Sequence, residues 1–171
     1  MVEIRLLGID PGKKGGLAIM KNGKIEDVMG MVVGGKDLDL EYIASWIVDA
    51  GPIDLAMIEK VHAFPIERKL KGGKTQKQGI VSMFTFGKVT GAIYGILATL
   101  KIPYRLVPPG TWKKLVLAGT DRTKEAALDH VKILYPYVEL KGTPQSRKPH
   151  NGIVDAICLA EYGWLTFGRR E

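Results

Sequence analysis

One stretch near the N-terminus decides the fold: Arg5-Leu6-Leu7-Gly8-Ile9-Asp10-Pro11-Gly12-Lys13-Lys14-Gly15-Gly16-Leu17-Ala18-Ile19-Met20. It is an apolar run that ends in one carboxylate, a turn rich in glycine and lysine, and a second apolar run. This pattern predicts two strands joined by a hairpin. Two interpretations of Asp10 are open. It either starts the turn, as Asp before Pro-Gly often does, or it is a buried charge that needs a partner such as a divalent cation.

The composition indicates a single globular domain with a basic surface. The chain has 171 residues, and its 25 basic and 18 acidic residues give a formal net charge of +7. We therefore expect one domain, residues 1–171, with a polyanionic partner, above all nucleic acid. A single cysteine, Cys158, excludes an internal disulfide framework and a cysteine-built zinc site. No apolar run is long enough to span a bilayer, so we expect a cytoplasmic protein that does not act at a membrane.

The order of the elements predicts a mixed α/β sheet. Three antiparallel strands at 3–10, 16–21 and 24–32 are followed by a helix at 40–50 and a strand at 53–59. Beyond these we expect a helix, a strand and three further helices, at residues 80–100, 102–107, 111–114, 122–135 and 149–165. Thr111 is expected to cap the helix at 111–114, Thr120 or Asp121 to cap the next one, and Pro149 to occupy the first turn of the last.

Three acids stand at comparable places in these elements. Glu59 ends the strand at 53–59, as Asp10 ends the first strand, and parallel neighbours would bring both to the same edge of the sheet. Asp155 lies in an apolar run of the last helix, one turn after Asn151; the alternative is an exposed acid at the edge of an amphipathic helix. Such a set suits two Mg²⁺ or Mn²⁺ ions and phosphodiester hydrolysis, and therefore favours a metal-dependent nuclease.

The segment 60–79 is basic and has neither a helical nor a strand period. We expect a loop that contacts phosphates rather than one that is only solvated. Phe64 and Phe84 could both stack on unpaired bases. For Phe84, which lies on the helix at 80–100, a place in the core is the first interpretation. The candidate nucleic-acid-binding residues, for several of which simple solvation is the alternative, are Lys13, Lys14, Lys60, His62, Phe64, Arg68, Lys69, Lys71, Lys74, Lys77, Gln78, Lys113, Lys124, Arg147 and Lys148.

Gly87, Gly91 and Gly95 form a stripe along the helix at 80–100. Such a stripe allows a second backbone to approach closely. Tight packing of the helix on the sheet is the first interpretation, and a subunit interface is the alternative.

The motifs taken in order resemble the RuvC-like branch of the ribonuclease H superfamily, especially its phage and organellar members. The resemblance covers essentially the whole chain and implies a mixed five-stranded sheet flanked by helices. It also implies a homodimer that resolves four-way (Holliday) DNA junctions by paired nicks, with Mg²⁺ at Asp10, Glu59 and Asp155. The matching segments are Gly8-Ile9-Asp10-Pro11-Gly12, Ile58-Glu59-Lys60-Val61-His62, Gln78-Gly79, Ser82-Met83-Phe84, Phe86-Gly87, Val107-Pro108-Pro109, Thr111-Trp112-Lys113-Lys114 and His150-Asn151-Gly152-Ile153-Val154-Asp155-Ala156.

Asn151 departs from this pattern, because phage members usually have an acid there. An amide oxygen carries no charge and is a poorer ligand for Mg²⁺. Three explanations are open: the position has been altered to suppress cleavage, three acids suffice, or His150 supplies the missing function. We favour the first, because the surrounding motif is intact.

Other functions fit parts of the sequence. Phosphotransferases of the actin-like group open with a similar hairpin, but 171 residues leave no second lobe, so we expect no nucleotide cofactor. A ribonuclease H-like nuclease acting on another branched or hybrid substrate shares the fold. A non-catalytic protein that binds DNA junctions is made more credible by Asn151.

Overall fold

The computed structural model describes residues 3–34, 37–60, 68–69, 75–76, 79–143 and 145–168. Five strands form one sheet in the order β3-β2-β1-β6-β9. The first three pair as an antiparallel meander, and β6 and β9 continue the sheet in parallel with β1. The predicted mixed five-stranded α/β sheet is therefore confirmed. The strand bounds are β1 Arg5–Asp10, β2 Gly16–Lys21, β3 Lys24–Gly30, β6 Leu55–Glu59 and β9 Tyr104–Val107.

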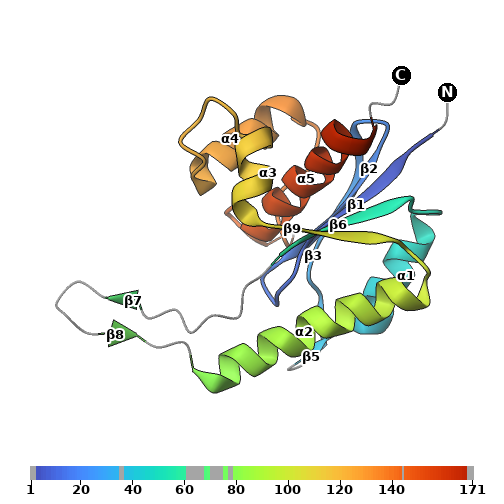
Figure 1. The fold of residues 1–171 in the computed structure, drawn as a ribbon, viewed down its shortest axis with the longest axis vertical. Helices are drawn as coiled ribbons and strands as arrows, with labels where there is room; N and C mark the ends of the chain where they lie inside the picture. The colour runs from blue at the N-terminus through green and yellow to red at the C-terminus, as the bar shows by residue number, and fades with distance from the viewer. Residues whose placement is uncertain are drawn as a thin grey trace.

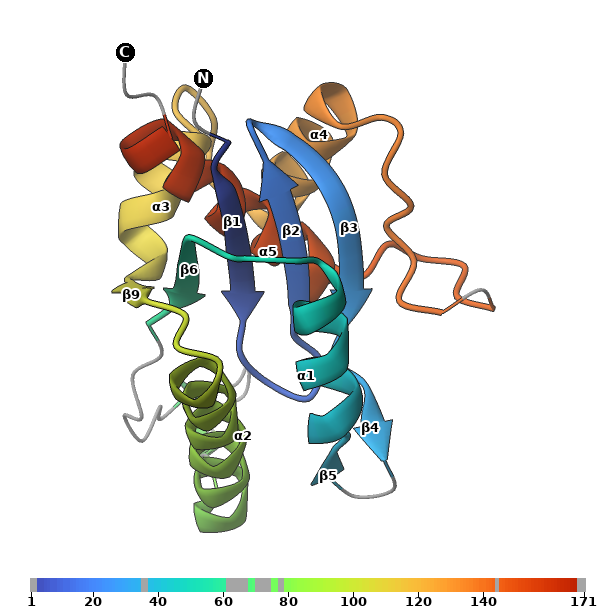
Figure 2. The same ribbon diagram turned by 90° about the vertical axis from the view of Figure 1, so that its right-hand side faces the viewer.

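Helices cover both faces of this sheet (Figure 1, Figure 2). One face carries α1 (Leu40–Asp49) and α2 (Ile80–Thr99). The other carries α5 (Asn151–Gly163), against which α3 (Pro109–Val116) and α4 (Lys124–Leu134) pack. The last helix continues as a π-helical turn at Trp164–Gly168. No helix in the described part of the chain is long and apolar enough to cross a membrane.

Alternate residues of β1 pack into two separate hydrophobic cores, one on each face of the sheet. Leu7 and Ile9 pack with the buried side of α1 and α2, whereas Leu6 packs with α3, α4 and α5. This alternation follows from the two-residue period of a strand, and it explains why β1 has no polar side chain between Arg5 and Asp10.

Glycines let α5 lie directly on the sheet. A Cβ atom at Gly8 would collide with the carbonyl oxygen of Ala156, and one at Gly16 would lie 2.6 Å from the backbone of Gly152. Gly15 also forms a bridge with Gly152. The start of α5 is thereby fixed against the turn that follows Asp10, and the helix brings Asp155 towards that acid.

Two short hairpins lie outside the main sheet. One pairs β4 (Val33–Gly34) with β5 (Asp37–Leu38). The other pairs β7 (Arg68–Lys69) with β8 (Thr75–Gln76). The expectation that residues 60–79 lack regular structure is therefore wrong at β7 and β8.

The helix starts differ from those expected. Pro109 begins α3, and Pro108 precedes it without a side-chain cap, so Thr111 lies inside the helix. Thr123 caps α4, whereas Asp121 accepts hydrogen bonds from the backbone N–H and the hydroxyl of Thr123. Pro149 lies before α5 rather than in its first turn. Proline favours a first-turn position because its missing N–H has no helical partner there, and at α3 this outweighed the threonine signal.

The glycine stripe of α2 faces solvent. No atom of the described residues lies within 4 Å of a Cβ atom built at Gly87, Gly91 or Gly95, so helix–sheet packing is the wrong explanation for them. The helix instead buries Val89, Ile93 and Leu97. Phe84 is 73% exposed, and its interpretation as a core residue is also wrong.

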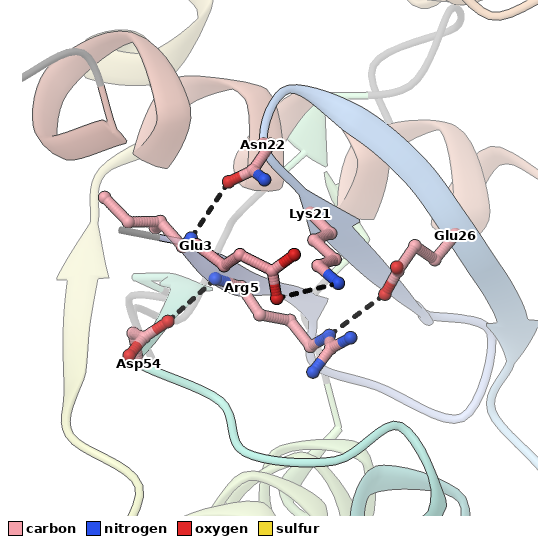
Figure 3. Close-up of polar contacts among 7 residues, drawn as sticks. Glu3, Arg5, Lys21, Asn22, Glu26 and Asp54 are labelled. Atoms are coloured by element: carbon pink, nitrogen blue, oxygen red, sulfur yellow. Dashed lines mark hydrogen bonds and ion pairs between the residues drawn. The ribbon is translucent and has the colours of Figure 1, made fainter. Parts of the chain in front are cut away.

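The N-terminal end of β1 is closed by paired charges (Figure 3). Arg5 Nε contacts Glu26 Oε2 at 2.9 Å, and Lys21 Nζ contacts Glu3 Oε2 at 2.9 Å. Asp54 Oδ2 accepts a hydrogen bond of 2.7 Å from the backbone N–H of Arg5. At the opposite end of the strand, Asp10 forms no such ion pair with a described residue.

Candidate active site

Asp10 and Glu59 end neighbouring parallel strands. The register of β1 and β6 pairs Ile9 with Ile58, so each acid comes directly after a paired residue. Both are half-buried at the carboxyl end of their strand. The sequence prediction that these two acids share one edge of the sheet is confirmed.

Asp155 joins them from α5. It is half-buried within a helix whose neighbouring residues, Val154 and Ala156, are buried. The negative charge of Asp155 raises the pKa of Asp10, and that of Glu59 raises the pKa of both aspartates. Asp155 is thus not an isolated acid at the rim of an amphipathic helix.

Burial and the neighbouring negative charges make the two aspartates, Asp10 and Asp155, hard to ionise. Burial first, and then the charges of Glu59 and Asp155, raise the pKa of Asp10 from 3.8 to about 8. Burial and the charge of Glu59 raise the pKa of Asp155 to about 6. Among the described residues, no cation forms an ion pair with either group. Perturbed acids gathered at one end of a sheet are typical of functional sites.

Two lysines act on the acids from a distance. The charge of Lys124, at the start of α4, lowers the pKa of both Asp10 and Asp155, and Lys113 in α3 lowers that of Asp155. Lys124 is exposed and Lys113 is half-buried. Both belong to the predicted nucleic-acid-binding set, and their place beside the acids suits contact with a bound phosphate.

Metal binding here would depend on the oxygen donors of the three acidic side chains. In the described part of the chain, no three His, Cys, Asp or Glu side chains form a group that could already hold a metal ion. Asp10, Glu59 and Asp155 nevertheless fit a hard divalent cation, because they are oxygen donors whose repulsion such an ion would relieve.

His150 serves as the N-cap of α5. Its Nδ1 accepts a hydrogen bond of 3.3 Å from the backbone N–H of Ile153. Its ring packs beside Gly142 and Gly30, and burial lowers its pKa. These contacts give the side chain a structural task. Asn151, the first residue of α5, is exposed and lies one turn before Asp155.

Trp112 is a site residue that sequence reasoning missed. Its side chain is fully buried, and its Nε1–H donates a hydrogen bond of 3.0 Å to Glu59 Oε1. A tryptophan in a short, otherwise basic helix was the available signal, because a buried indole N–H requires an acceptor.

The remaining candidates lie in several separate segments of the chain. Lys13 and Lys14 are exposed in the turn after Asp10, Lys60 is exposed directly after Glu59, and Arg147 and Lys148 are exposed in the segment before α5. Arg68 and Lys69 form β7, where only the backbone is described. The other candidates lie outside the described residues: His62, Phe64, Lys71, Lys74, Lys77 and Gln78.

Known structures share this fold. No protein-family model and no curated protein sequence matches the chain. The structure of T. thermophilus RuvC in complex with a Holliday junction substrate aligns with a TM-score of 0.62 and 14% identity over 96% of each chain. A second Thermus thermophilus RuvC structure gives a TM-score of 0.61 and 16% identity, over 96% of this chain and 97% of that one. The chain therefore has the RuvC-like form of the ribonuclease H-like fold.

Proposed function

We propose that this protein is a metal-dependent endonuclease that nicks opposed strands of four-way DNA junctions. The observation that carries the proposal is the meeting of Asp10, Glu59 and Asp155 at one end of the sheet, with raised pKa values for both aspartates. The fold supports it, since a protein of the same fold has been solved with a Holliday junction substrate.

Asp10, Glu59 and Asp155 would hold the metal. Two Mg²⁺ or Mn²⁺ ions bound there would neutralise charge on the phosphodiester and lower the pKa of the attacking water. The acids must be ionised to bind a metal, so Asp10, whose pKa is raised to about 8, would have to lose its proton for the metal to bind. Lys113 and Lys124 place positive charge where the substrate phosphate would lie.

Asn151 limits this site to three carboxylates. Its exposed amide can offer one oxygen but no charge. His150 is a poor substitute, because its Nδ1 already caps α5 and its ring is packed against glycines. We therefore propose that this chain binds a junction and cleaves it slowly. The same residue favours the second candidate, a junction-binding protein without catalysis.

A homodimer would supply two active sites for symmetric nicks. Helix α2 would offer a surface for it, because Gly87, Gly91 and Gly95 have no neighbour within 4 Å of a built Cβ atom in the described part of the chain and Val81 is 78% exposed. A second copy of α2 could approach this stripe closely. Phe84, 73% exposed on the same helix, is suited to stacking on unpaired bases at the junction centre.

The direct test of substrate choice is a binding competition. An immobile four-way junction and a linear duplex of equal length would compete for the protein in Ca²⁺, so that cleavage does not interfere. We expect the junction to bind at least about 100-fold more tightly at moderate salt. Equal affinity would exclude junction selectivity and leave only a general nucleic-acid-binding domain.

A further inference from the structure

Trp112 connects α3 to the acid at the end of β6. Its Nε1–H lies 3.0 Å from Glu59 Oε1, and the indole is fully buried. We propose that Trp112 is a positioning residue, which holds the Glu59 carboxylate in one orientation so that its other oxygen is presented to the ion. The inference rests on the proposed function, because it assumes that Glu59 is a metal ligand.

The backbone makes this support rigid. Glu59 pairs with Val107 across β6 and β9, and the N–H of Lys60 donates to the carbonyl oxygen of Val107 at 2.7 Å. Two prolines then lead directly into α3, where the N–H of Trp112 bonds back to the carbonyl oxygen of Pro108 at 3.4 Å. Glu59 is therefore fixed at the end of β6, and the indole is carried by a helix that begins shortly after the neighbouring strand β9.

The hydrogen bond from Trp112 leaves one carboxylate oxygen of Glu59 available to bind an ion. Within the described residues, the indole N–H donates to Oε1, and no side chain donates a hydrogen bond to Oε2. A carboxylate that must bind an ion gains from a partner that limits its rotation, and loss of such a partner typically costs 10–100-fold in metal affinity. Lys113 Nζ lies 5.2 Å from the centroid of the Trp112 ring, so the same indole also contacts a cation whose charge acts on Asp155.

A second hydrogen bond between a tryptophan and a carboxylate provides a control, which distinguishes the positioning of Glu59 from a general loss of stability. Trp46 Nε1–H donates to Asp27 Oδ2 at 2.9 Å, joining α1 to β3. Asp27 is not among the clustered acids. Loss of either indole N–H removes one bond to a carboxylate, but only the Trp112 bond involves a proposed ligand.

The experiment measures Mn²⁺ binding to the whole chain by electron paramagnetic resonance, comparing the unaltered protein with Trp112→Phe and Trp46→Phe. We expect Trp112→Phe to weaken Mn²⁺ binding about 10-fold and Trp46→Phe to change it less than about twofold. Equal binding by the unaltered protein and Trp112→Phe would overturn the positioning role and leave the proposed function intact. Absence of Mn²⁺ binding to the unaltered protein would overturn both.

A second measurement needs no change at Trp112, in case Phe disturbs the core. The chain contains three tryptophans, Trp46, Trp112 and Trp164, whose indole N–H signals can be assigned with Trp46→Phe and Trp164→Phe. On titration with Mg²⁺, we expect the Trp112 signal to shift while the other two stay in place. A stationary Trp112 signal in protein saturated with Mg²⁺ would contradict the proposal.

Discussion

Asp10 and Glu59 end adjacent parallel strands, each one residue beyond the paired Ile9 and Ile58, and no described cation forms an ion pair with Asp10. The charge of Glu59 helps to raise the pKa of Asp10 to about 8. The opposite end of β1 shows the contrast, since Arg5 there pairs with Glu26 (Figure 3). The carboxyl of Asp10 is thus hard to ionise at this edge, which the proposed function explains by a cation that the acids would bind.

The first prediction concerns the cost in stability of ionising this carboxyl in metal-free protein. The pKa of Asp10 in the folded state lies above the unfolded value of 3.8, so the folded state binds the extra proton. Its stability therefore falls as the pH rises from about 4 to about 8. Asp10→Asn removes the charge, and we expect it to raise the free energy of unfolding by about 2–4 kcal/mol near pH 8 and by little near pH 4.

Urea unfolding in a chelator, at both pH values, measures this effect. Asp54→Asn is the control, because Asp54 accepts a hydrogen bond at the other end of β1 and should give no gain. Saturating Mg²⁺ should remove the advantage of Asp10→Asn by stabilising the unaltered protein. A variant no more stable than the unaltered chain near pH 8 would show that Asp10 bears no such cost.

The sheet and the placement of Asp10 and Glu59 at one edge were predictable, because strand periodicity and the parallel order of the two strands are enough to bring both acids there. The contact of Trp112 with Glu59 was not, since it joins residues 53 positions apart through the packing of α3. The glycines of α2 show a second limit. A stripe of small residues permits close approach, but periodicity does not reveal whether the approaching surface belongs to the same chain.

The second prediction concerns the contact that places Asp155. Gly8→Ala would put a methyl group into the backbone of α5, because Ala156 occupies that space. We expect the free energy of unfolding to fall by about 3 kcal/mol or more, measured by urea titration. Gly110→Ala is the control, since none of the described atoms lies within 4 Å of a Cβ atom there and alanine favours a helix. Equal stability of the two variants would contradict the direct packing of α5 on β1.

The third prediction concerns Lys124, whose charge acts on both aspartates. If it contacts a substrate phosphate, Lys124→Gln should weaken junction binding and reduce the slope of log affinity against log salt by about 1. Lys24→Gln is the matched control, because Lys24 is an exposed lysine that begins β3, directly after the turn at the other end of the sheet. An unchanged salt slope for Lys124→Gln would remove Lys124 from the DNA interface.

The fourth prediction concerns the open stripe of α2. Gly91→Glu would place a charged side chain where a second copy should pack, so we expect sedimentation to show a monomer. Ser45→Glu, at an exposed position of α1, should leave the dimer intact. A dimer that survives Gly91→Glu and also Gly95→Glu would show that the subunits do not meet through this stripe.

Cleavage of a labelled, immobile four-way junction in Mg²⁺ tests the central claim most directly. It compares this chain, Asn151→Asp and the double variant Asn151→Asp with Asp10→Asn, each against a linear duplex of equal length. We predict that Asn151→Asp makes paired, symmetric nicks in opposed strands, that this chain cuts about 100-fold more slowly, and that the double variant does not cut. Equal cleavage by this chain and Asn151→Asp would show that three acids suffice. Cleavage that ignores the junction, or that survives Asp10→Asn, would contradict the claim that this is a metal-dependent junction endonuclease.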